Sequence, residues 1–342
     1  MKIAEIAKLS NVSKSAVSLA LNNKPGVSAQ TRERILTIVR NSGYMPRSLV
    51  NTDQLFGPSK TICFLACPNT DIITHQYPSS TFFAELIRSI EKKCKEIGYT
   101  LIYNTLEGSN LKEEVELFEK EYTVGGIILL GTNLSSADIQ LFSNHKFNLV
   151  VVDNYYEFMN NDFIVMNNAQ GAYQAAKHLM GLGHKRIGYV QSHTRINNFN
   201  SRKNGFLSAL TEGNLTLDEQ DVYTVGIDIE TARHDFFEML SKSSGSLPSA
   251  LFCESDYIAI GVVNALQDSG YAVPKNISVI GFDDVPQSTV IRPKLTTIHV
   301  DKESLGAMAV QRLEDIIENR NTETLKTMID TELVERNSCR HV

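Results

Sequence analysis

The chain has few of the features that mark an exported or membrane-bound protein. Its 342 residues contain five cysteines, an odd number without paired spacing, so we expect free thiols in a reducing cytoplasm rather than a disulfide framework. No apolar run approaches the roughly 20 residues that a membrane span needs, and no signal peptide precedes residue 3. These absences predict a cytoplasmic protein without a membrane partner, and they disfavour a secreted binding protein.

Motifs for catalysis and cofactor binding are also scarce. The sequence has no phosphate-binding P-loop, and Gly181 and Gly183 follow a predicted helix, whereas a dinucleotide-binding fingerprint follows a strand. The eight histidines are scattered, and none has metal-ligand spacing with cysteines or acids. Asp283 and Asp284 could act as acid and base, but no nucleophile motif accompanies them. We therefore expect a protein that is not an enzyme, with no catalytic residue, metal or cofactor.

Charge divides the chain into two unequal parts. Residues 1–60 hold nine Lys and Arg against three acids, a net charge of +6, whereas the whole chain carries −6 and the remainder therefore −12. A basic segment on an acidic body favours phosphate binding by the small part and repulsion elsewhere. A solvated helical bundle with a chance charge excess would have the same charge balance. The helical pattern must therefore distinguish such a bundle from a DNA-binding segment.

That pattern predicts three short helices within residues 3–42, the first two joined by a tight turn. The hydroxyls of Ser13 and Ser28 can cap the second and third helices by accepting a hydrogen bond from a free backbone amide. Pro25 and Gly26 interrupt the chain, and Gly43 is expected to end the third helix. The apolar positions expected to face inward are Ile3, Ile6, Ala7, Leu9, Ala16, Val17, Ala20, Leu21, Ile35, Ile38 and Val39.

Such a helix-turn-helix holds one helix firmly enough to enter a DNA groove. The second helix would present Lys14, Ser15, Ser18, Leu19 and Asn22 outward. Together with the charge balance, this arrangement predicts DNA binding.

From residue 61 on, apolar runs alternate with amphipathic segments. We predict strands over residues 61–67, 100–104, 126–130, 149–153, 163–166, 187–191, 222–225, 250–253, 278–282 and 296–299. We predict helices over residues 82–97, 111–121, 135–142, 169–182, 202–212, 229–240, 256–269 and 302–319. Repeated strand–helix units imply parallel sheets covered on both faces. Two such units, each of about five strands, would meet at a cleft.

Polar residues follow several of these strands. Ligands of open parallel sheets bind beyond the carboxyl ends of the strands. Carboxylates and an Arg fork are suited to gripping a polyol, because each can bond two adjacent hydroxyls. An Asp after a strand often only caps the next helix, so a purely structural role is as good an interpretation for each residue alone. The candidates are Asp153, Arg202 (expected to open a helix), Ser255, Asp256, Asp283 and Asp284.

Four amino-terminal segments form a recognisable pattern: residues 12–18 (VSKSAVS), 21–28 (LNNKPGVS), 31–35 (TRERI) and 43–46 (GYMP). With these segments the amino-terminal part resembles the headpiece of the lactose-repressor (LacI/GalR) family of bacterial transcription regulators. The resemblance implies that Lys14, Ser15 and Ser18 meet base edges and that Asn22, Ser28 and Thr31 hold phosphates.

Two departures from the family pattern concern DNA. Leu19 stands where the family usually has Arg, and Leu cannot form the two hydrogen bonds that Arg makes with guanine, although it can touch a thymine methyl. Residues 47–60 stand where the family has a hinge helix that wedges a Leu into the minor groove. Leu55 or Leu49 could take that role, with a spacing from Tyr44 that fits neither well.

The body resembles the same family. The matching segments are residues 165–172 (VMNNAQGA), 183–187 (GHKRI), 202–206 (RKNGF), 277–284 (ISVIGFDD) and 293–298 (PKLTTI). The resemblance implies that Arg202 and Asp283 contact an effector, that Asp153 lies near it, and that Phe82 and Ser255 lie on the rim of the cleft. Residues 69–80 form a longer loop than is usual there, which could alter effector choice.

The expected architecture is a small all-α helix-turn-helix headpiece (residues 1–46), a hinge (47–60) and an α/β periplasmic-binding-protein-like body of two doubly wound parallel-sheet lobes (61–342). The N-lobe is expected at about 61–164 and 298–324, and the C-lobe at about 165–294 and 325–342.

The expected function is that of a sequence-specific transcription regulator, a repressor, that binds operator DNA as a homodimer. A small molecule would control its operator affinity, with a sugar or sugar phosphate as the first candidate and a purine as the second. A cytoplasmic solute-binding protein, or an enzyme that processes sugars or nucleotides on the same body, is the alternative. Leu86, Ile90 and Cys94 either face a dimer partner or cover their own sheet.

Overall fold

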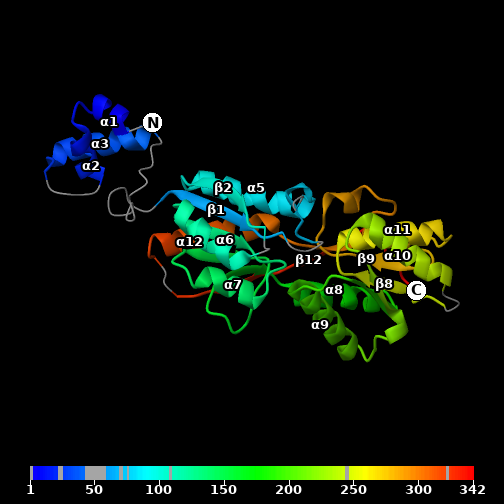
Figure 1. Ribbon diagram of the computed structural model, residues 1–342. Helices are drawn as coiled ribbons and strands as arrows, with labels where there is room; N and C mark the ends of the chain where they lie inside the picture. Colours follow the sequence, from blue (N-terminus) through cyan, green and yellow to red (C-terminus); the bar gives the residue numbers. More distant parts are fainter. Residues whose placement is uncertain are drawn as a thin grey trace. The chain divides into compact units, whose positions relative to one another are not determined.

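The computed structural model describes residues 3–21, 26–42, 59–68, 72–74, 77–107, 110–242, 246–320 and 323–342 (Figure 1). The chain divides into two compact units, Met1–Lys60 with Thr123–Gly125, and the body formed by Thr61–Tyr122 and Gly126–Val342. Among the described residues, no helix combines the length and the apolar character that crossing a membrane demands.

The amino-terminal unit contains α1 (Ile3–Leu9), α2 (Lys14–Leu21) and α3 (Ala29–Ser42). Its core is formed by the buried side chains of Ile6, Ala7, Val17, Ala20 and Ile35.

The turn and the helix starts follow the expected chemistry. Asn11 takes a left-handed conformation (φ 51°) in the turn between α1 and α2, which Asn tolerates better than most residues. Ser13 accepts a hydrogen bond from the Ala16 amide at 3.1 Å, and Ser28 accepts one from the Thr31 amide at 3.2 Å. The three helices and both predicted caps are therefore confirmed.

One predicted core position in this unit is wrong. Leu9, the last residue of α1, is 63% exposed, and Ser10 is buried instead. The Ser10 hydroxyl donates to the carbonyl oxygen of Ile6 at 2.5 Å, so this polar side chain is satisfied inside the turn.

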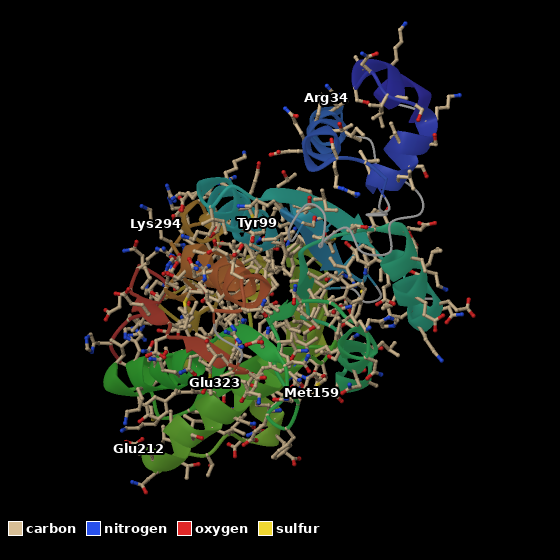
Figure 2. The ribbon with its side chains drawn as sticks, turned by 90° about the vertical axis from the view of Figure 1, so that its left-hand side faces the viewer. Arg34, Tyr99, Met159, Glu212, Lys294 and Glu323 are labelled. Atoms are coloured by element: carbon tan, nitrogen blue, oxygen red, sulfur yellow. The ribbon has the colours of Figure 1, made fainter. Side chains whose placement is uncertain are left out.

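The first lobe of the body is a six-stranded sheet in the order β11-β5-β4-β3-β1-β2, with every neighbouring pair parallel. Its strands are β1 (Thr61–Ala66), β2 (Thr100–Thr105), β3 (Gly126–Leu130), β4 (Leu149–Val152), β5 (Asp162–Met166) and β11 (Lys326–Ile329). The helices α5 (Thr81–Glu96) and α12 (Lys302–Ile317) pack together over it, and α6 (Leu111–Glu121) packs with α7 (Ser136–Ser143). Figure 2 shows Tyr99, whose hydroxyl donates to Glu318 just after α12 at 3.4 Å.

The second lobe is a four-stranded parallel sheet in the order β7-β6-β8-β9. Its strands are β6 (Ile187–Ser192), β7 (Val222–Val225), β8 (Ala250–Cys253) and β9 (Ser278–Ile280). The helix pairs are α8 (Asn168–Gly181) with α9 (Asn197–Glu212), and α10 (Ile229–Lys242) with α11 (Asp256–Asp268). The short elements are η1 (Tyr77–Ser79), η2 (Glu219–Asp221), η3 (Pro286–Thr289) and the antiparallel pair β10 (Thr297–His299) and β12 (Glu332–Val334).

The chain passes between the lobes three times, at residues 166–168, 299–302 and 329–332, because β5, α12 and β11 belong to the first lobe and their chain neighbours to the second. The doubly wound, two-lobed body is as predicted, but the sheets have six and four strands rather than five each. One expected boundary is wrong: β11 lies in the first lobe, although residues 325–342 were expected in the second. The sequence did not predict β11, because this strand is half-exposed and partly polar and contains no apolar run.

The apolar stripe on α5 covers its own sheet. Leu86, Ile90 and Cys94 are at most 1% exposed within the single chain and belong to the main core of the body. The structural alternative is therefore confirmed, and these three residues do not form a dimer face.

Close packing of α8 on α9 gives a prediction about stability. A Cβ atom on Gly205 would overlap the carbonyl oxygen of Ala169, whereas one on Gly181 would meet no described atom within 4 Å. We expect Gly205→Ala to lower the free energy of unfolding by at least about 2 kcal/mol, because backbone cannot yield as a side chain does. The matched change Gly181→Ala should be neutral or stabilising by up to about 1 kcal/mol. Urea denaturation measures both, and equal effects would contradict the packing.

Candidate functional site: a cavity between the lobes and an exposed helix

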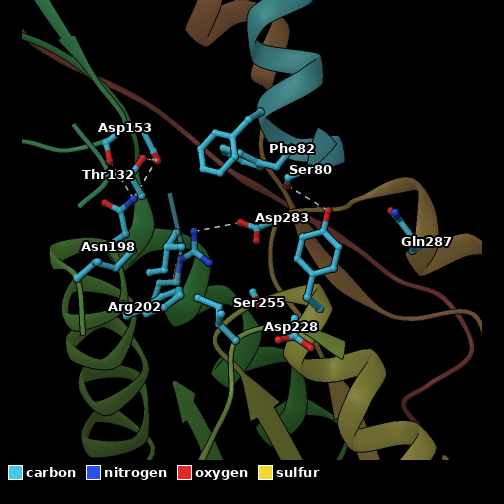
Figure 3. Close-up of a pocket in the computed structure, with 16 residues that line it drawn as sticks. Ser80, Phe82, Thr132, Asp153, Asn198, Arg202, Asp228, Ser255, Asp283 and Gln287 are labelled. Carbon is cyan, nitrogen blue, oxygen red and sulfur yellow. Dashed lines mark hydrogen bonds and ion pairs between the residues drawn. The ribbon is translucent and has the colours of Figure 1, made fainter. Parts of the chain in front are cut away.

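A cavity of about 360 Å³ lies between the two lobes of the body. The five residues predicted to bind an effector all line it: Phe82, Asp153, Arg202, Ser255 and Asp283 (Figure 3). Asp153 follows β4 of the first lobe, and Asp283 follows β9 of the second, so the carboxyl ends of both sheets meet there.

Arg202 is fixed from several sides. Its side chain is buried, with Nη2 3.1 Å from Asp283 Oδ1 and Nε donating to Asn168 Oδ1 at 2.8 Å. Nη1 donates to the carbonyl oxygen of Glu254. The guanidinium also stacks on Phe282, 3.7 Å from the ring centroid. These contacts hold the fork in one orientation, so little side-chain entropy would be lost when a ligand binds. Arg202 does not open a helix as predicted, because α9 begins at Asn197.

Asp283 is held in an unusual backbone conformation, with φ 111°. Its amide donates to the Ile298 carbonyl at 2.8 Å, and its own carbonyl accepts from Lys302 Nζ at 2.8 Å. Among the described residues no partner is found for Oδ2, the carboxylate oxygen that Arg202 leaves open. Burial raises the pKa of Asp283, although the charges of Arg202 and Lys302 oppose that shift. A strained residue with an open acceptor in a cavity is typical of a ligand site.

Asp153 is the second buried acid, again with a positive φ, 63°. It accepts hydrogen bonds from Thr132 and, at 3.0 Å, from Asn198 Nδ2. Burial raises the pKa of Asp153 to about 6, and the charge of Asp283 adds to this rise. The hydrogen bond from Thr132 acts in the opposite direction and lowers the pKa. Near neutral pH the carboxyl is therefore close to its titration point, and as an acid it can donate as well as accept.

Aromatic rings form the apolar part of the cavity. Phe82 and Phe83 make an edge-to-face pair with centroids 5.3 Å apart, and Phe199 and Tyr257 line the second lobe's side. The Tyr257 hydroxyl is 2.7 Å from Thr81 Oγ1 on α5, so it joins the two lobes. Flat apolar faces beside polar groups suit the C–H face of a sugar ring or a planar base.

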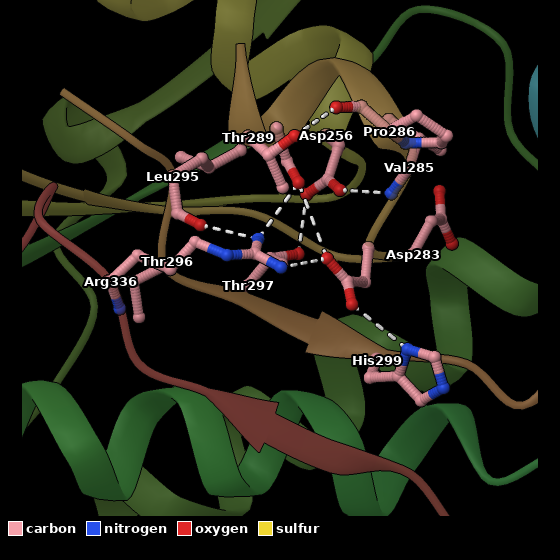
Figure 4. Close-up of polar contacts among 12 residues, drawn as sticks. Asp256, Asp283, Val285, Pro286, Thr289, Leu295, Thr296, Thr297, His299 and Arg336 are labelled. Atoms are coloured by element: carbon pink, nitrogen blue, oxygen red, sulfur yellow. Dashed lines mark hydrogen bonds and ion pairs between the residues drawn. The ribbon is translucent and has the colours of Figure 1, made fainter. Parts of the chain in front are cut away.

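Asp284 and Asp256 serve the fold rather than the cavity (Figure 4). Burial disfavours the Asp284 carboxylate, but hydrogen bonds from His299 at 3.0 Å and Arg336 at 2.5 Å hold its pKa at about 2. Asp256 accepts from the Thr297 hydroxyl at 2.5 Å and the Val285 amide at 2.9 Å, and burial raises its pKa well above the usual value. Both tie down the loop that begins at Asp283.

The helix predicted to read DNA is α2. Lys14, Ser15 and Ser18 are exposed on it, and Leu19 is half-buried, close enough to Gly26 that a Cβ there would lie 3.3 Å from Leu19 Cδ1. Arg32 on α3 donates to the Ala20 carbonyl at 3.0 Å and fixes the end of the helix.

Of the predicted phosphate contacts, Ser28 directly precedes α3, Thr31 lies in its first turn, and Asn22 is outside the described residues. Ser28 is exposed, and its hydroxyl donates to the half-buried Thr31 at 2.9 Å. Asn22, Leu55, Leu49 and the hinge except its last two residues lie outside the described residues, and so do 69–71, 75 and 76 of the long loop. The roles of these residues stay predictions.

Sequence reasoning missed several residues that line the cavity, among them Phe83, Thr132, Asn198 and Tyr257. Thr132 follows the predicted strand 126–130, so the same strand-end rule would have found it. Asn198 was hidden because α9 begins more than a turn before the predicted helix.

A helix-turn-helix unit attached to a two-lobed receptor with a central cavity defines the class of one-chain, receptor-bearing DNA-binding regulators. Residues 2–47 match the family of bacterial regulatory proteins, lacI family, and residues 176–339 match the periplasmic binding protein-like domain.

Relatives cover nearly the whole chain. It is 31% identical over 327 residues to the ribose operon repressor of Haemophilus influenzae, covering 95% of this chain and 94% of that protein. It is 30% identical over 344 residues to the HTH-type transcriptional repressor PurR of Actinobacillus pleuropneumoniae, covering 99% and 98%. The Lac repressor dimer bound to operator and the anti-inducer ONPF has the same fold, with a TM-score of 0.74, 22% identity and 99% coverage of both chains. The chain belongs to the LacI family of bacterial transcription regulators, as its sequence resemblance indicated.

The raised pKa of Asp153 predicts how stability depends on pH. Because the folded pKa is about 6 and the ordinary value 3.8, the folded chain binds more protons than the unfolded chain between these values. Its free energy of unfolding therefore falls as pH rises through this window, by about 3 kcal/mol in total. Asp153→Asn removes this pH dependence. The free energy of unfolding of the variant, relative to that of the wild type, should therefore be about 2 kcal/mol higher at pH 8 than at pH 4.5. Urea denaturation at both pH values measures this increase, and a constant difference would contradict it.

Proposed function

We propose that this protein is a transcriptional repressor whose affinity for operator DNA is controlled by a small molecule bound between the lobes of its body. The observation that carries the proposal is the joining, in one chain, of an exposed polar helix on a basic unit with a cavity lined by Asp153, Asp283 and Arg202. Membership of the LacI family supports both halves.

A small neutral sugar is the effector that the cavity supports best. Asp283 Oδ2 and the oxygens of Asp153 can accept from sugar hydroxyls, and Phe82 offers a ring face. A sugar phosphate is disfavoured, because Arg202 is the one cation among the described lining residues and already pairs with Asp283. A purine base would use the rings but has fewer donors for two acids. The name of one relative, a ribose operon repressor, points to the first of these classes, and D-ribose is the first probe.

Control of DNA binding would follow from the position of the ligand. A sugar that binds Asp153 of the first lobe and Asp283 of the second has a different affinity for each arrangement of the lobes. In a homodimer, two headpieces read a near-palindromic operator, so a change in the lobes alters how the headpieces fit the two half-sites. This regulator would act in the cytoplasm, where its operator is.

The outward face of α2 gives the first test of this function. Lys14→Ala should weaken binding to DNA from upstream of its own gene about tenfold or more, because a base or phosphate contact is lost. Lys8→Ala, which changes an exposed lysine of α1, is the matched control and should have a small effect. Gel shifts at several salt concentrations measure both variants. Equal affinities for Lys14→Ala and the wild type would show that α2 is not the reading helix.

The cavity gives the second test. Arg202→Ala should abolish the response of operator binding to the effector while leaving operator binding itself intact, since Arg202 lies in the body. Fluorescence anisotropy of labelled operator with D-ribose, other neutral sugars and purine bases measures the response. Arg202→Lys keeps the charge without the fork and should lose most of the response.

Arg186→Ala is the matched control, because Arg186 pairs with Asp221 at 2.7 Å outside the cavity. Thermal unfolding checks that each variant is folded. An unchanged response in folded Arg202→Ala would overturn the assignment of the cavity.

A further inference from the structure

One buried lysine behind the cavity contacts both lobes. Lys302 is the first residue of α12, at the end of the crossing at residues 299–302, and is 6% exposed. Its Nζ donates to the carbonyl oxygen of Asp283 at 2.8 Å, lies 3.4 Å from Glu85 Oε2 and is 5.6 Å from the ring centroid of Phe82. Lys302 does not itself line the cavity.

These three neighbours connect the ligand site to the first lobe. Asp283 belongs to the second lobe, whereas Phe82 and Glu85 lie on α5 of the first, and α5 packs against α12. Two of the three, Asp283 and Phe82, line the cavity. The ammonium group therefore lies close to two residues of the ligand site, Asp283 in the second lobe and Phe82 in the first, and to Glu85 on the helix that carries Phe82.

Because Lys302 is buried, its ammonium group has to keep its contacts with oxygen atoms. A buried ammonium without partners costs several kcal/mol in solvation, so Lys302 must follow its acceptors when they move. The two acceptors differ: the Asp283 carbonyl is bonded at 2.8 Å, while Glu85 is a longer contact on a side chain that is 32% exposed. Lys302 can thus move toward Glu85 when the Asp283 carbonyl turns away.

We propose that Lys302 is a positioning residue that transmits occupancy of the cavity to the α5–α12 helix pair of the first lobe. The inference rests on the proposed function. A sugar bonded to Asp283 Oδ2 and stacked on Phe82 shifts both cavity-lining neighbours of the ammonium, and Lys302 passes that shift to Glu85 and to the first turn of α12. The coupling comes from the difference between the Lys302 contacts in the two states, as linkage requires.

The test compares Lys302→Met and Glu85→Gln with the control Lys92→Met. Lys92 also joins α5 to α12, bonding Glu303 at 2.7 Å, but it is 62% exposed and both residues belong to the first lobe. The operator Kd of each full-length variant is measured with and without saturating D-ribose, and the Kd of D-ribose is measured separately by calorimetry.

In the wild type and in Lys92→Met we expect the two operator Kd values to differ by roughly 5- to 150-fold, the usual range of allosteric coupling. In Lys302→Met the operator Kd values with and without D-ribose should differ by no more than about twofold, although D-ribose still binds. The ratio of the two Kd values in Glu85→Gln should lie between those of Lys302→Met and the wild type. A full ratio in both variants would overturn the role of Lys302. An absent response in the wild type would overturn the proposed function with D-ribose as its effector.

A measurement without ligand tests the same link independently. Hydrogen exchange of the free protein should be faster in Lys302→Met both at residues 283–289 of the second lobe and in the first turn of α12, because both lose the bond that joins them. Lys92→Met should leave residues 283–289 unchanged. Equal exchange at residues 283–289 in Lys302→Met and the wild type would overturn the inference, whatever the effector is.

Discussion

The buried ion pair between Arg202 and Asp283 is the interaction on which the receptor half of this protein depends. Removing two charges from water is costly, and such a pair persists only when further bonds satisfy both groups. Arg202 has these in Asn168, the Glu254 carbonyl and the Phe282 ring. Asp283 is bonded through both backbone groups but keeps one carboxylate oxygen open toward the cavity. That oxygen can accept a hydrogen bond from a ligand hydroxyl, which favours a polyol.

The same region holds the lobes together. Asn198 on α9 bonds Asp153 across the cleft, and Tyr257 on α11 bonds Thr81 on α5. Both contacts lie at residues that line the cavity or next to one, so a ligand there exchanges contacts with the interface between the lobes. Ligand binding and the arrangement of the lobes are therefore coupled in one equilibrium. Protonation or hydration of the buried acids Asp153 and Asp283 shifts this equilibrium.

Much of this architecture was predictable because buried parallel strands are continuous apolar runs in the sequence. Buried runs such as residues 126–130 and 149–152 are apolar throughout, and the strand-end rule placed Asp153 and Asp283 in the cavity. β11 was missed because a half-exposed edge strand carries no such run. The strand-end pattern alone could not distinguish Asp283 from Asp284. The family resemblance singled out Asp283, and the fold shows that Arg336 and His299 bond Asp284 instead. Lys302 escaped notice because its partners are 19 and 217 residues away along the chain.

The central claim is that a small molecule in the cavity and operator DNA on the headpiece bias the same equilibrium. The most direct measurement is reciprocal: calorimetric titration of D-ribose into the free protein and into the protein saturated with operator duplex. The account predicts two dissociation constants that differ by the same factor by which D-ribose changes operator affinity. Equal dissociation constants in the two titrations would contradict it, because a ligand that binds both states equally shifts neither.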